Sequence, residues 1–394
     1  MSNVNDFVIE DGVLRAYNGV GGDVVIPEGV RVIDSSVFYK RKDITSVSFP
    51  EGLTEIGFSS FSQCDGIKKI SLPNGLNEIG VAAFANCPSL AEVSLPDTLI
   101  NIKGYAFDKC PALENIFIPA SVQLIDTGAF GSCISMTNIT VDKNNRAYCS
   151  VDGILYNERV SELVRYPSGK TDPSFSIPDT VKTVGTLAFE ECGFLKSISI
   201  PASVYNIGDQ PFSGCTGITE FCVDEGSRWF RAIDGALYTE SGEELVSYAC
   251  GKEVAAVTLP RGVEHIRNVA FKKCKNITKV TLPGSVQRID VAAFINCENL
   301  REINIPYKVK GLDRGTFADC KRLSEVSFRK GFKYIGESVF QNCTALTDII
   351  IPDSVDDIFY DAFWDCNNLT IHASKGSYAE EFANENKIPF KAID

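Results

Sequence analysis

A proline recurs every 23 residues along most of this chain and sets a frame for all its other features. Proline occupies eleven of twelve frame positions, Arg329 being the exception: Pro27, Pro50, Pro73, Pro96, Pro119, Pro178, Pro201, Pro260, Pro283, Pro306 and Pro352. The two longer gaps, each of 59 residues, equal 23 plus 36. Self-similarity at a fixed period is the signature of a repeat array. The chain therefore holds twelve repeats, two of which carry an insertion of equal length.

Further columns of residues follow the same frame. Eleven residues after each frame position the chain has Phe in all twelve repeats, from Phe38 to Phe363. Fourteen residues after it stands Cys in eleven repeats, and only Arg41 interrupts this column. The sixth position is always Ile, Val or Leu, and the seventeenth is Leu, Ile or Met. Because a single repeat cannot bury these residues alone, we expect the repeats to stack into a solenoid with a continuous core.

Short alternating stretches such as "KKISLP" precede the frame positions. Alternation predicts a strand with one buried face, and proline ends it because proline has no N–H to donate. Gly or Asp at the seventh position in nine of twelve repeats indicates a turn. We therefore expect one short parallel strand per repeat, stacked about 4.8 Å apart.

The combined pattern L-x-x-I-x-I-P-x-x-V-x-x-I-G-x-x-A-F-x-x-C resembles the BspA-like (Treponema pallidum-type) leucine-rich repeat family. Residues 112–133, "ALENIFIPASVQLIDTGAFGSC", match that pattern almost position by position, and the resemblance covers about residues 24–372. It implies a repeat solenoid: a leucine-rich-repeat right-handed α/β-type superhelix dominated by short parallel β-strands. It also implies a surface-exposed or host-facing binding protein of the kind found in many bacteria and some parasitic protists.

The frame divides the chain into three parts. Residues 1–26 form an N-terminal cap hairpin with Asp11-Gly12 as its turn, residues 27–372 form the solenoid, and residues 373–394 form a C-terminal cap. Ser377 followed by Glu380 is a capping-box signature and predicts a short helix to about Lys387.

The two insertions, at about 142–177 and 224–259, resemble each other and the N-terminal cap. Each contains an Asp-Gly pair followed by Leu-Tyr, which predicts two β-hairpins that project from the stack. They would either brace the solenoid or form a partner-binding lobe. Their aromatic residues are candidates for an exposed binding surface: Tyr148, Tyr166, Trp229 and Phe230.

The cysteine column is expected to consist of buried free thiols, because a small, mostly apolar side chain with a weak S–H donor suits a tight turn. Stacked one strand apart, these residues would also lie within disulfide reach, so bridging stays open. The chain has no Cys-x-x-Cys pair, and a metal or redox role is not favoured. Cys149, Cys222 and Cys250 lie outside the column and are the candidates for exposed, reactive thiols.

No constellation of catalytic residues is evident, and we expect neither an enzyme nor a cofactor or metal. Of the two histidines, His265 is expected in a solvated turn and His372 in the C-terminal cap. The net charge of −13 argues against nucleic acid as a partner, and no stretch of 18 apolar residues predicts membrane insertion.

The outward positions of the strands form a sheet face of mostly small residues, interrupted by Phe117 and Ile350. This face is either a solvated surface or a concave docking surface for another protein, including a host or matrix protein, or for a glycan. Phe117 and Ile350 join the aromatic residues of the insertions as candidate binding residues.

The sequence thus predicts a monomeric, non-enzymatic binding or scaffold solenoid. A surface or host-interaction protein is the first expectation, an intracellular scaffold the alternative and a glycan-binding module the more distant one. We expect a cytoplasmic location if Met1 is the natural start, and a cell-surface or secreted one if a signal peptide has been removed. Fourteen cysteines would suit a reducing compartment.

Overall fold

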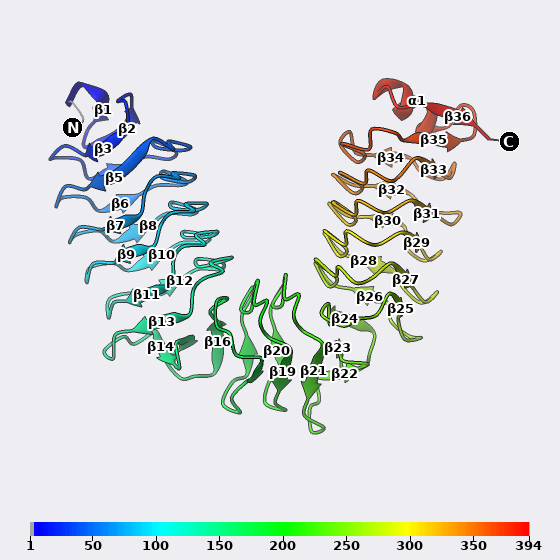
Figure 1. Ribbon diagram of the computed structural model, residues 1–394, viewed down its shortest axis with the longest axis horizontal. Helices are drawn as coiled ribbons and strands as arrows, with labels where there is room; N and C mark the ends of the chain where they lie inside the picture. The colour runs from blue at the N-terminus through cyan, green and yellow to red at the C-terminus, as the bar shows by residue number, and fades with distance from the viewer. Residues whose placement is uncertain (1–3, 394) are drawn as a thin grey trace. The chain divides into compact units, whose positions relative to one another are not determined.

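Short strands recur at two places in every repeat of the computed structural model, which describes residues 4–393 (Figure 1). The first set follows the twelve frame positions, and each member has two residues of which the second is buried. These strands are β4 (Val32–Ile33), β6 (Glu55–Ile56), β8 (Glu78–Ile79), β10 (Asn101–Ile102), β12 (Leu124–Ile125), β18 (Thr183–Val184), β20 (Asn206–Ile207), β26 (His265–Ile266), β28 (Arg288–Ile289), β30 (Gly311–Leu312), β32 (Tyr334–Ile335) and β34 (Asp357–Ile358). The sequence predicted only one strand per repeat, so this second set is a new finding.

The other set comprises the predicted strands before the frame positions and their C-terminal continuation. They are β3 (Gly22–Val25), β5 (Ile44–Ser48), β7 (Lys69–Ser71), β9 (Glu92–Ser94), β11 (Asn115–Ile118), β13 (Asn138–Val141), β17 (Ser174–Ser176), β19 (Ser197–Ile200), β21 (Glu220–Val223), β25 (Ala256–Thr258), β27 (Lys279–Thr281), β29 (Glu302–Asn304), β31 (Glu325–Ser327), β33 (Asp348–Ile350), β35 (Thr370–Ala373) and β36 (Phe390–Ala392). Where neighbours in this set pair, they pair in parallel, as in β29 with β31, where Glu302 lies opposite Glu325. The predicted parallel solenoid of 23-residue repeats is confirmed.

The phenylalanine column forms the centre of the core. Within the first run of repeats the rings from Phe38 to Phe130 stack with centroid distances of 4.7 to 5.8 Å and interplanar angles of 4 to 11°. The run from Phe271 to Phe363 stacks in the same way. All these rings are buried, so the column supplies both the apolar area and the stacking contacts that hold successive repeats together.

The cysteine column has a distinct hydrogen-bonding role. The Sγ of Cys64 lies 3.1 Å from the backbone oxygen of Phe38 in the preceding repeat, and the Sγ of Cys297 lies 3.0 Å from that of Phe271. Six other cysteines repeat the contact 26 residues back: Cys87, Cys110, Cys133, Cys320, Cys343 and Cys366. In the first repeat Arg41 takes this place, and its guanidinium donates to Tyr17 O and Gly19 O. The column therefore satisfies buried carbonyl groups that lie beside the phenylalanine stack.

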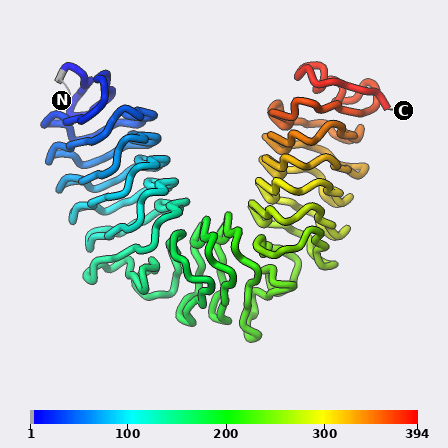
Figure 2. The backbone as a smooth tube through the Cα atoms, viewed as in Figure 1, coloured from blue at the N-terminus to red at the C-terminus, as the bar shows by residue number. Residues whose placement is uncertain are grey.

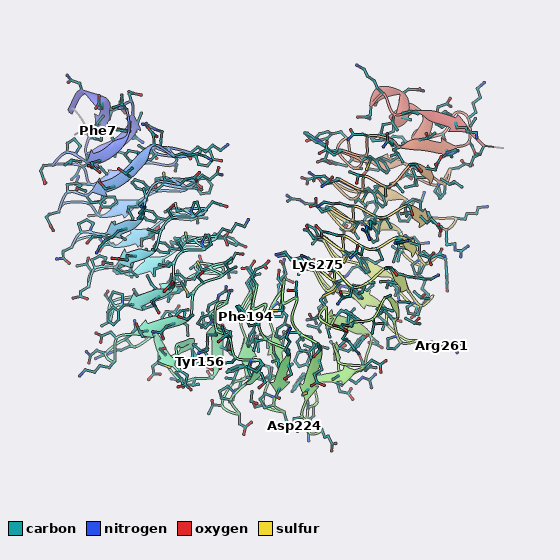
Figure 3. All side chains as sticks on the ribbon, viewed as in Figure 1. Phe7, Tyr156, Phe194, Asp224, Arg261 and Lys275 are labelled. Carbon is teal, nitrogen blue, oxygen red and sulfur yellow. A yellow bond between two sulfur atoms is a disulfide. The ribbon has the colours of Figure 1, made fainter. Side chains whose placement is uncertain are left out.

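Each insertion is a three-stranded antiparallel module rather than a projecting hairpin. The first module consists of β14 (Tyr148–Val151), β15 (Ile154–Asn157) and β16 (Glu162–Arg165), and the second of β22 (Phe230–Ile233), β23 (Ala236–Thr239) and β24 (Glu244–Ser247). The predicted Asp-Gly turns are present, with positive φ at both residues as a tight hairpin requires. The third strand then pairs in parallel with the next short strand, β16 with β18 and β24 with β26. Tyr156 in β15 is buried, and Figure 3 marks its place in the chain.

The chain ends are closed by different elements. A 3₁₀ turn, η1 (Val4–Asp6), precedes the antiparallel pair β1 (Phe7–Glu10) and β2 (Val13–Tyr17), and β2 pairs in parallel with β4. At the other end α1 (Tyr378–Glu385) begins after Ser377, whose side chain accepts a hydrogen bond from the Glu380 N–H. Among the described residues α-helix is confined to α1, so the connections within the repeats are turns. None of the described helices has the length and apolar character to cross a membrane.

Backbone contacts group the chain into two compact units. The first comprises residues up to Asp172 with Thr180–Gly193 and Asn206–Phe212, and the second comprises Pro173–Asp179, Phe194–Tyr205 and Ser213–Asp394. Each unit has its own continuous apolar core. Within each unit the backbone makes one circuit per repeat (Figure 2). The division of the sequence into two caps and one solenoid stays a prediction, and residues 1–3 and 394 lie outside the described residues.

Candidate binding surfaces

A groove of about 910 Å³ lies over the outward face of the strands before the frame positions in the second unit. Its floor is formed by one small or polar side chain from each of three successive strands, Thr281, Asn304 and Ser327. We call this the strand groove; its lining residues are Lys279, Val280, Thr281, Leu282, Gly284, Glu302, Ile303, Asn304, Ile305, Pro306, Tyr307, Ser324, Glu325, Val326, Ser327, Arg329, Asp348 and Ile350. A floor of short side chains lets another backbone approach the sheet closely.

Two large apolar side chains of the strand groove face solvent. Ile350, predicted as a binding residue, is 59% exposed at the end of β33, and Tyr307 is 58% exposed just after Pro306. Sequence reasoning missed Tyr307, although no other repeat has an aromatic residue directly after its frame position. Exposed apolar side chains beside a groove are typical anchors for a partner.

The rim of the strand groove carries more acidic than basic groups. Glu302, Glu325 and Asp348 follow one another on β29, β31 and β33. The basic residues of the lining are Lys279, which lies opposite Glu302 on β27, and Arg329. Lys279 pairs with Glu302, and the Nε2 of His372 lies 2.7 Å from Asp348. Among residues 4–393 no basic group forms an ion pair with Glu325, so this carboxylate is free to meet a partner's cation.

The other predicted exposed residues lie on separate surfaces. Phe117 is half-exposed on β11, opposite Thr140 of β13, and belongs to the first unit. Trp229 is half-exposed in the second unit, and its ring lies 6.1 Å from that of Tyr205, which is also half-exposed. Sequence reasoning missed Tyr205 because only the fold brings it beside the insertion. The exposure of Phe117 and Trp229 is confirmed, whereas their binding role stays a prediction.

The exposure predicted for Tyr166 and Phe230 is wrong, because both side chains are buried. Tyr166 lies 23 residues before Phe189, in line with the phenylalanine column, and its ring stacks on that of Phe189 at a centroid distance of 5.3 Å. Tyr148 is half-buried, and its hydroxyl accepts a hydrogen bond of 2.8 Å from the N–H of Ile125 at the end of β12. Tyr148 and Tyr166 brace the first unit, and neither they nor Phe230 leave much aromatic surface for a ligand.

His265 is not in a solvated turn, as expected from the sequence, but on β26 with a side chain only 12% exposed. Its Nε2 lies 2.6 Å from Asp290 Oδ2 and its Nδ1 lies 3.5 Å from Glu244 Oε1. Arg288 contacts both ring nitrogens within 3.1 Å. These groups come from three adjacent rungs, and a groove of about 510 Å³ adjoins them. With both nitrogens engaged, the imidazole is held in an ion-pair network rather than presented to a substrate.

Arg267, two residues after His265, completes this network. Its Nε and Nη2 donate to Glu244 Oε2 at 2.9 and 2.6 Å. Burial raises the pKa of Glu244, but these hydrogen bonds and the nearby positive charge outweigh burial and hold the pKa below its usual range. Among the described residues no cluster of three His, Cys, Asp or Glu side chains could hold a metal ion.

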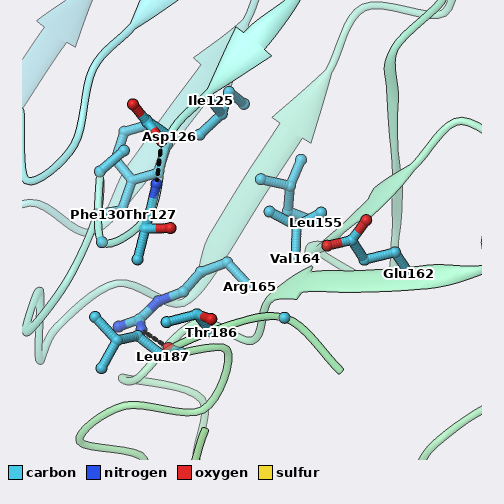
Figure 4. Close-up of a pocket in the computed structure, with 13 residues that line it drawn as sticks. Ile125, Asp126, Thr127, Phe130, Leu155, Glu162, Val164, Arg165, Thr186 and Leu187 are labelled. Carbon is cyan, nitrogen blue, oxygen red and sulfur yellow. Dashed lines mark hydrogen bonds between the residues drawn. The ribbon is translucent and has the colours of Figure 1, made fainter. Parts of the chain in front are cut away.

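A second charged cluster lies where the first module joins the following repeats, beside a cavity of about 100 Å³ (Figure 4). Arg165 is buried there and donates to Leu187 O and to Ser168 Oγ, both at 2.7 Å. The Glu190 carboxylate lies 3.9 Å from its guanidinium. Among the described residues, neither Arg165 Nε nor Glu190 Oε2 has a hydrogen-bond partner. Burial and the charge of Glu190 raise the pKa of nearby Asp108 to about 6.

The exposure predicted for the cysteines outside the column is confirmed for Cys222 and wrong for Cys250. Cys250 is buried and forms a disulfide with Cys274 of the column, which corrects the expectation for both residues. Cys222 is exposed and Cys149 is half-buried, but burial and a neighbouring glutamate raise the pKa of each thiol. Thiolate formation is therefore disfavoured at neutral pH. In the column, burial raises the pKa of the Cys87 and Cys133 thiols to about 12.

Comparisons with known proteins agree with this geometry. Among solved structures, a leucine-rich cell surface protein from Faecalibacterium prausnitzii is 27% identical, with a TM-score of 0.55 over 97% of this chain and 94% of that chain. The pneumococcal vaccine antigen PcpA is 16% identical, with a TM-score of 0.54 over 98% of this chain and 96% of that chain, and shows the fold alone. No curated protein sequence matches the chain. The model of the BspA-type leucine-rich repeat region matches residues 23–150, 170–233 and 246–370 in six copies. The chain belongs to the BspA-type leucine-rich repeat family.

Proposed function

We propose that this chain is a non-enzymatic protein-binding solenoid that docks an extended segment of a partner protein in the strand groove. The observation that carries the proposal is a groove of about 910 Å³ with two exposed apolar side chains, Ile350 and Tyr307, in its lining. A partner segment that covered them would remove both from water, worth about 1.5–3 kcal/mol for each side chain that is fully buried.

The rim of the strand groove favours one kind of partner. Glu302, Glu325 and Asp348 outnumber Lys279 and Arg329, so a segment with apolar residues and one or two basic residues complements it. The small floor residues give little energy themselves but allow close approach and exclude water around the anchors.

A surface or secreted location belongs to the same proposal. The Faecalibacterium relative is described as a cell surface protein, and a disulfide such as Cys250–Cys274 persists in oxidising compartments. The alternative is an intracellular scaffold. Labelling intact cells with a membrane-impermeant amine reagent separates the two, since only a surface protein reacts before lysis.

The binding proposal is tested with a displayed library of random twelve-residue peptides, selected on the full chain. We expect selected peptides to contain apolar and basic residues. Their affinity should fall at least tenfold for the double variant Tyr307→Ser/Ile350→Ser. The matched control, Phe117→Ser, changes a half-exposed side chain at an outward strand position of the first unit, outside the strand groove, and should leave affinity unchanged. Selected peptides that bind the double variant as well as the unchanged chain would refute this site.

A glycan is a second candidate ligand, favoured by the exposed pair Trp229 and Tyr205. Aromatic faces with polar surroundings can pack against the C–H face of a sugar ring. A glycan array probed with the chain and with Trp229→Ala would detect this activity. Equal signals for both proteins, or none, would remove this candidate and leave the protein-binding proposal intact.

A further inference from the structure

The last repeat carries a group of exposed aromatic residues that the other repeats lack. Phe359, Tyr360 and Trp364 occupy the seventh, eighth and twelfth positions after Pro352. Tyr360 is 70% exposed, Trp364 is 58% exposed and Phe359 is about two-fifths exposed. In the other eleven repeats these three positions hold only two aromatic residues in total, Phe58 and Tyr39, in separate repeats.

These three residues lie on one turn of the chain. The rings of Phe359 and Tyr360 are 5.0 Å apart, and the N–H of Trp364 donates to Asp361 O at 3.0 Å. The turn is held in place from the preceding repeat, because Ser338 donates to both carboxylate oxygens of Asp361 at 2.8 and 2.9 Å. Large apolar rings fixed in an exposed position have no role in the core, which Phe363 supplies in this repeat.

The same stretch is strongly acidic. Residues 352–366 contain five aspartates and no lysine or arginine. Asp361 accepts hydrogen bonds from Ser338, and Asp356 forms an ion pair with Lys333 at 3.1 Å. For the remaining three, Asp353, Asp357 and Asp365, the described part of the chain offers no ion-pair partner. Exposed aromatic faces beside unpaired carboxylates attract organic cations, through the ring quadrupole and through charge.

We propose that this aromatic and acidic turn, residues 357–365, is a docking surface for an arginine- or lysine-rich segment of a partner protein. Guanidinium groups stack on the rings of Tyr360 and Trp364, while Asp357 and Asp365 neutralise their charge. The surface is separate from the strand groove and does not depend on it. The chain's overall negative charge, −13, steers a basic partner towards the molecule, and the aromatic turn fixes where it binds.

Tryptophan fluorescence tests the proposal directly, because the chain has only two tryptophans. In a Trp229→Phe background Trp364 is the sole reporter, and nonaarginine is the probe at 150 mM salt. We expect a saturable change in Trp364 emission, and at least a tenfold weaker affinity for Asp357→Asn/Asp365→Asn and for Tyr360→Ser. Nonaglutamate should give no change.

A charge-matched control distinguishes docking from general attraction. Asp97→Asn/Asp179→Asn removes the same charge from two exposed positions directly after Pro96 and Pro178. Unchanged affinity in this control, with the losses above, supports the proposal. Equal weakening in both double variants would mean that only net charge matters. An unchanged Trp364 emission with nonaarginine would overturn the proposal, and a response to choline alone would assign the surface to quaternary ammonium groups instead. None of these outcomes bears on the strand groove, since none of the variants alters it.

Discussion

The first inserted module, β14–β16, and the second, β22–β24, have the same strand order, the same register and the same irregularity before their third strand. Each ends in a buried tyrosine that stacks on the first ring of the next run. Tyr166 lies 5.3 Å from Phe189, and Tyr248 lies 4.9 Å from Phe271. The modules therefore start each new run of repeats, as β1 and β2 start the first run with Tyr17 on Phe38.

The modules differ in how they are fastened to the repeats that follow. In the first, Arg165 and Ser168 bind the loop after Phe189, and the Ser168 hydroxyl donates to Glu190 O at 2.8 Å. In the second, the residues 82 positions later are Ser247 and Cys250, and Cys250 forms a disulfide with Cys274. One junction uses buried charge and hydrogen bonds, and the other uses a covalent bond.

This difference shows which residues determine the module and which secure it. The backbone pairing and the stacked tyrosine are common to both, so they are sufficient to begin a run. The fastening residues differ in kind between the two modules, so no one set of them is required for a run to begin. The following predictions test this division, from the largest expected effect to the smallest.

Phe294→Ala removes one ring of the phenylalanine column at a position outside both modules. We expect a loss of about 3–5 kcal/mol in the free energy of unfolding, because the cavity cannot collapse between two stacked neighbours. Urea denaturation followed by circular dichroism measures it. Val20→Ala, at a fully exposed side chain, should stay within about 0.5 kcal/mol of the unchanged chain. If both variants behave alike, the phenylalanine column is not the core.

Cys250→Ser removes the disulfide and gives the second module the serine of the first. We expect a loss of about 3 kcal/mol under oxidising conditions, because the bond closes a loop of 24 residues in the unfolded chain. With a reductant present, the difference from the unchanged chain should largely disappear. Urea denaturation with and without reductant measures both values.

The reciprocal change, Ser168→Cys, places a thiol at the equivalent position beside Cys192. We expect it to add a second disulfide, with Cys192. A thiol count on the oxidised, denatured protein should then give eleven, because four of the fifteen cysteines are in disulfides, against twelve for the unchanged chain. A count of thirteen would show that the two junctions are not equivalent.

The run interiors could be predicted from the sequence because each column repeats at one spacing. A buried phenylalanine or an outward residue such as Ile350 follows from position in the frame alone. The cysteine column was assigned correctly to the interior, although its contact with the carbonyl 26 residues back requires the backbone path.

Inside the insertions the frame proline is absent, and prediction failed there. Tyr166 lies 23 residues before Phe189, but tyrosine replaces the phenylalanine of the column, so this residue was not assigned to the core. Phe230 was missed because its burial follows from the pairing of β22 with β23, which only the fold shows. The ion-pair network of His265 was missed because its partners come from neighbouring repeats and, in the case of Glu244, from an inserted module. The two-residue strands were missed because two residues carry no period to detect.

Arg165→Met tests the charged junction of the first module. The change removes the guanidinium that lies near the Glu190 carboxylate, whose side chain is nearly buried and close to Asp108. We therefore expect the free energy of unfolding to fall by about 2–3 kcal/mol at neutral pH. The second module has serine at the equivalent position and should unfold as before. Urea denaturation measures the loss, and Arg261→Met at an exposed position is the matched control. A stable Arg165→Met variant would mean that the tyrosine stack alone fastens this module.

Asp108→Asn should have the smallest effect, and its sign depends on pH. The folded chain raises the pKa of Asp108 to about 6 through burial and the charge of Glu190, so the folded state favours the protonated form. That preference stabilises the fold fully below the usual pKa of an aspartate and is lost as pH rises through about 6. At pH 7.5 the ionised carboxylate of Asp108 destabilises the folded chain. The Asp108→Asn variant should therefore have a free energy of unfolding about 1 kcal/mol higher, after allowance for the partial exposure of the side chain. Near pH 3.5 the variant and the unchanged chain should be equally stable. Thermal unfolding across this range, with Asp97→Asn as control, should show the gain appear between these pH values. A gain that is constant with pH would show that Asp108 does not titrate as part of this junction.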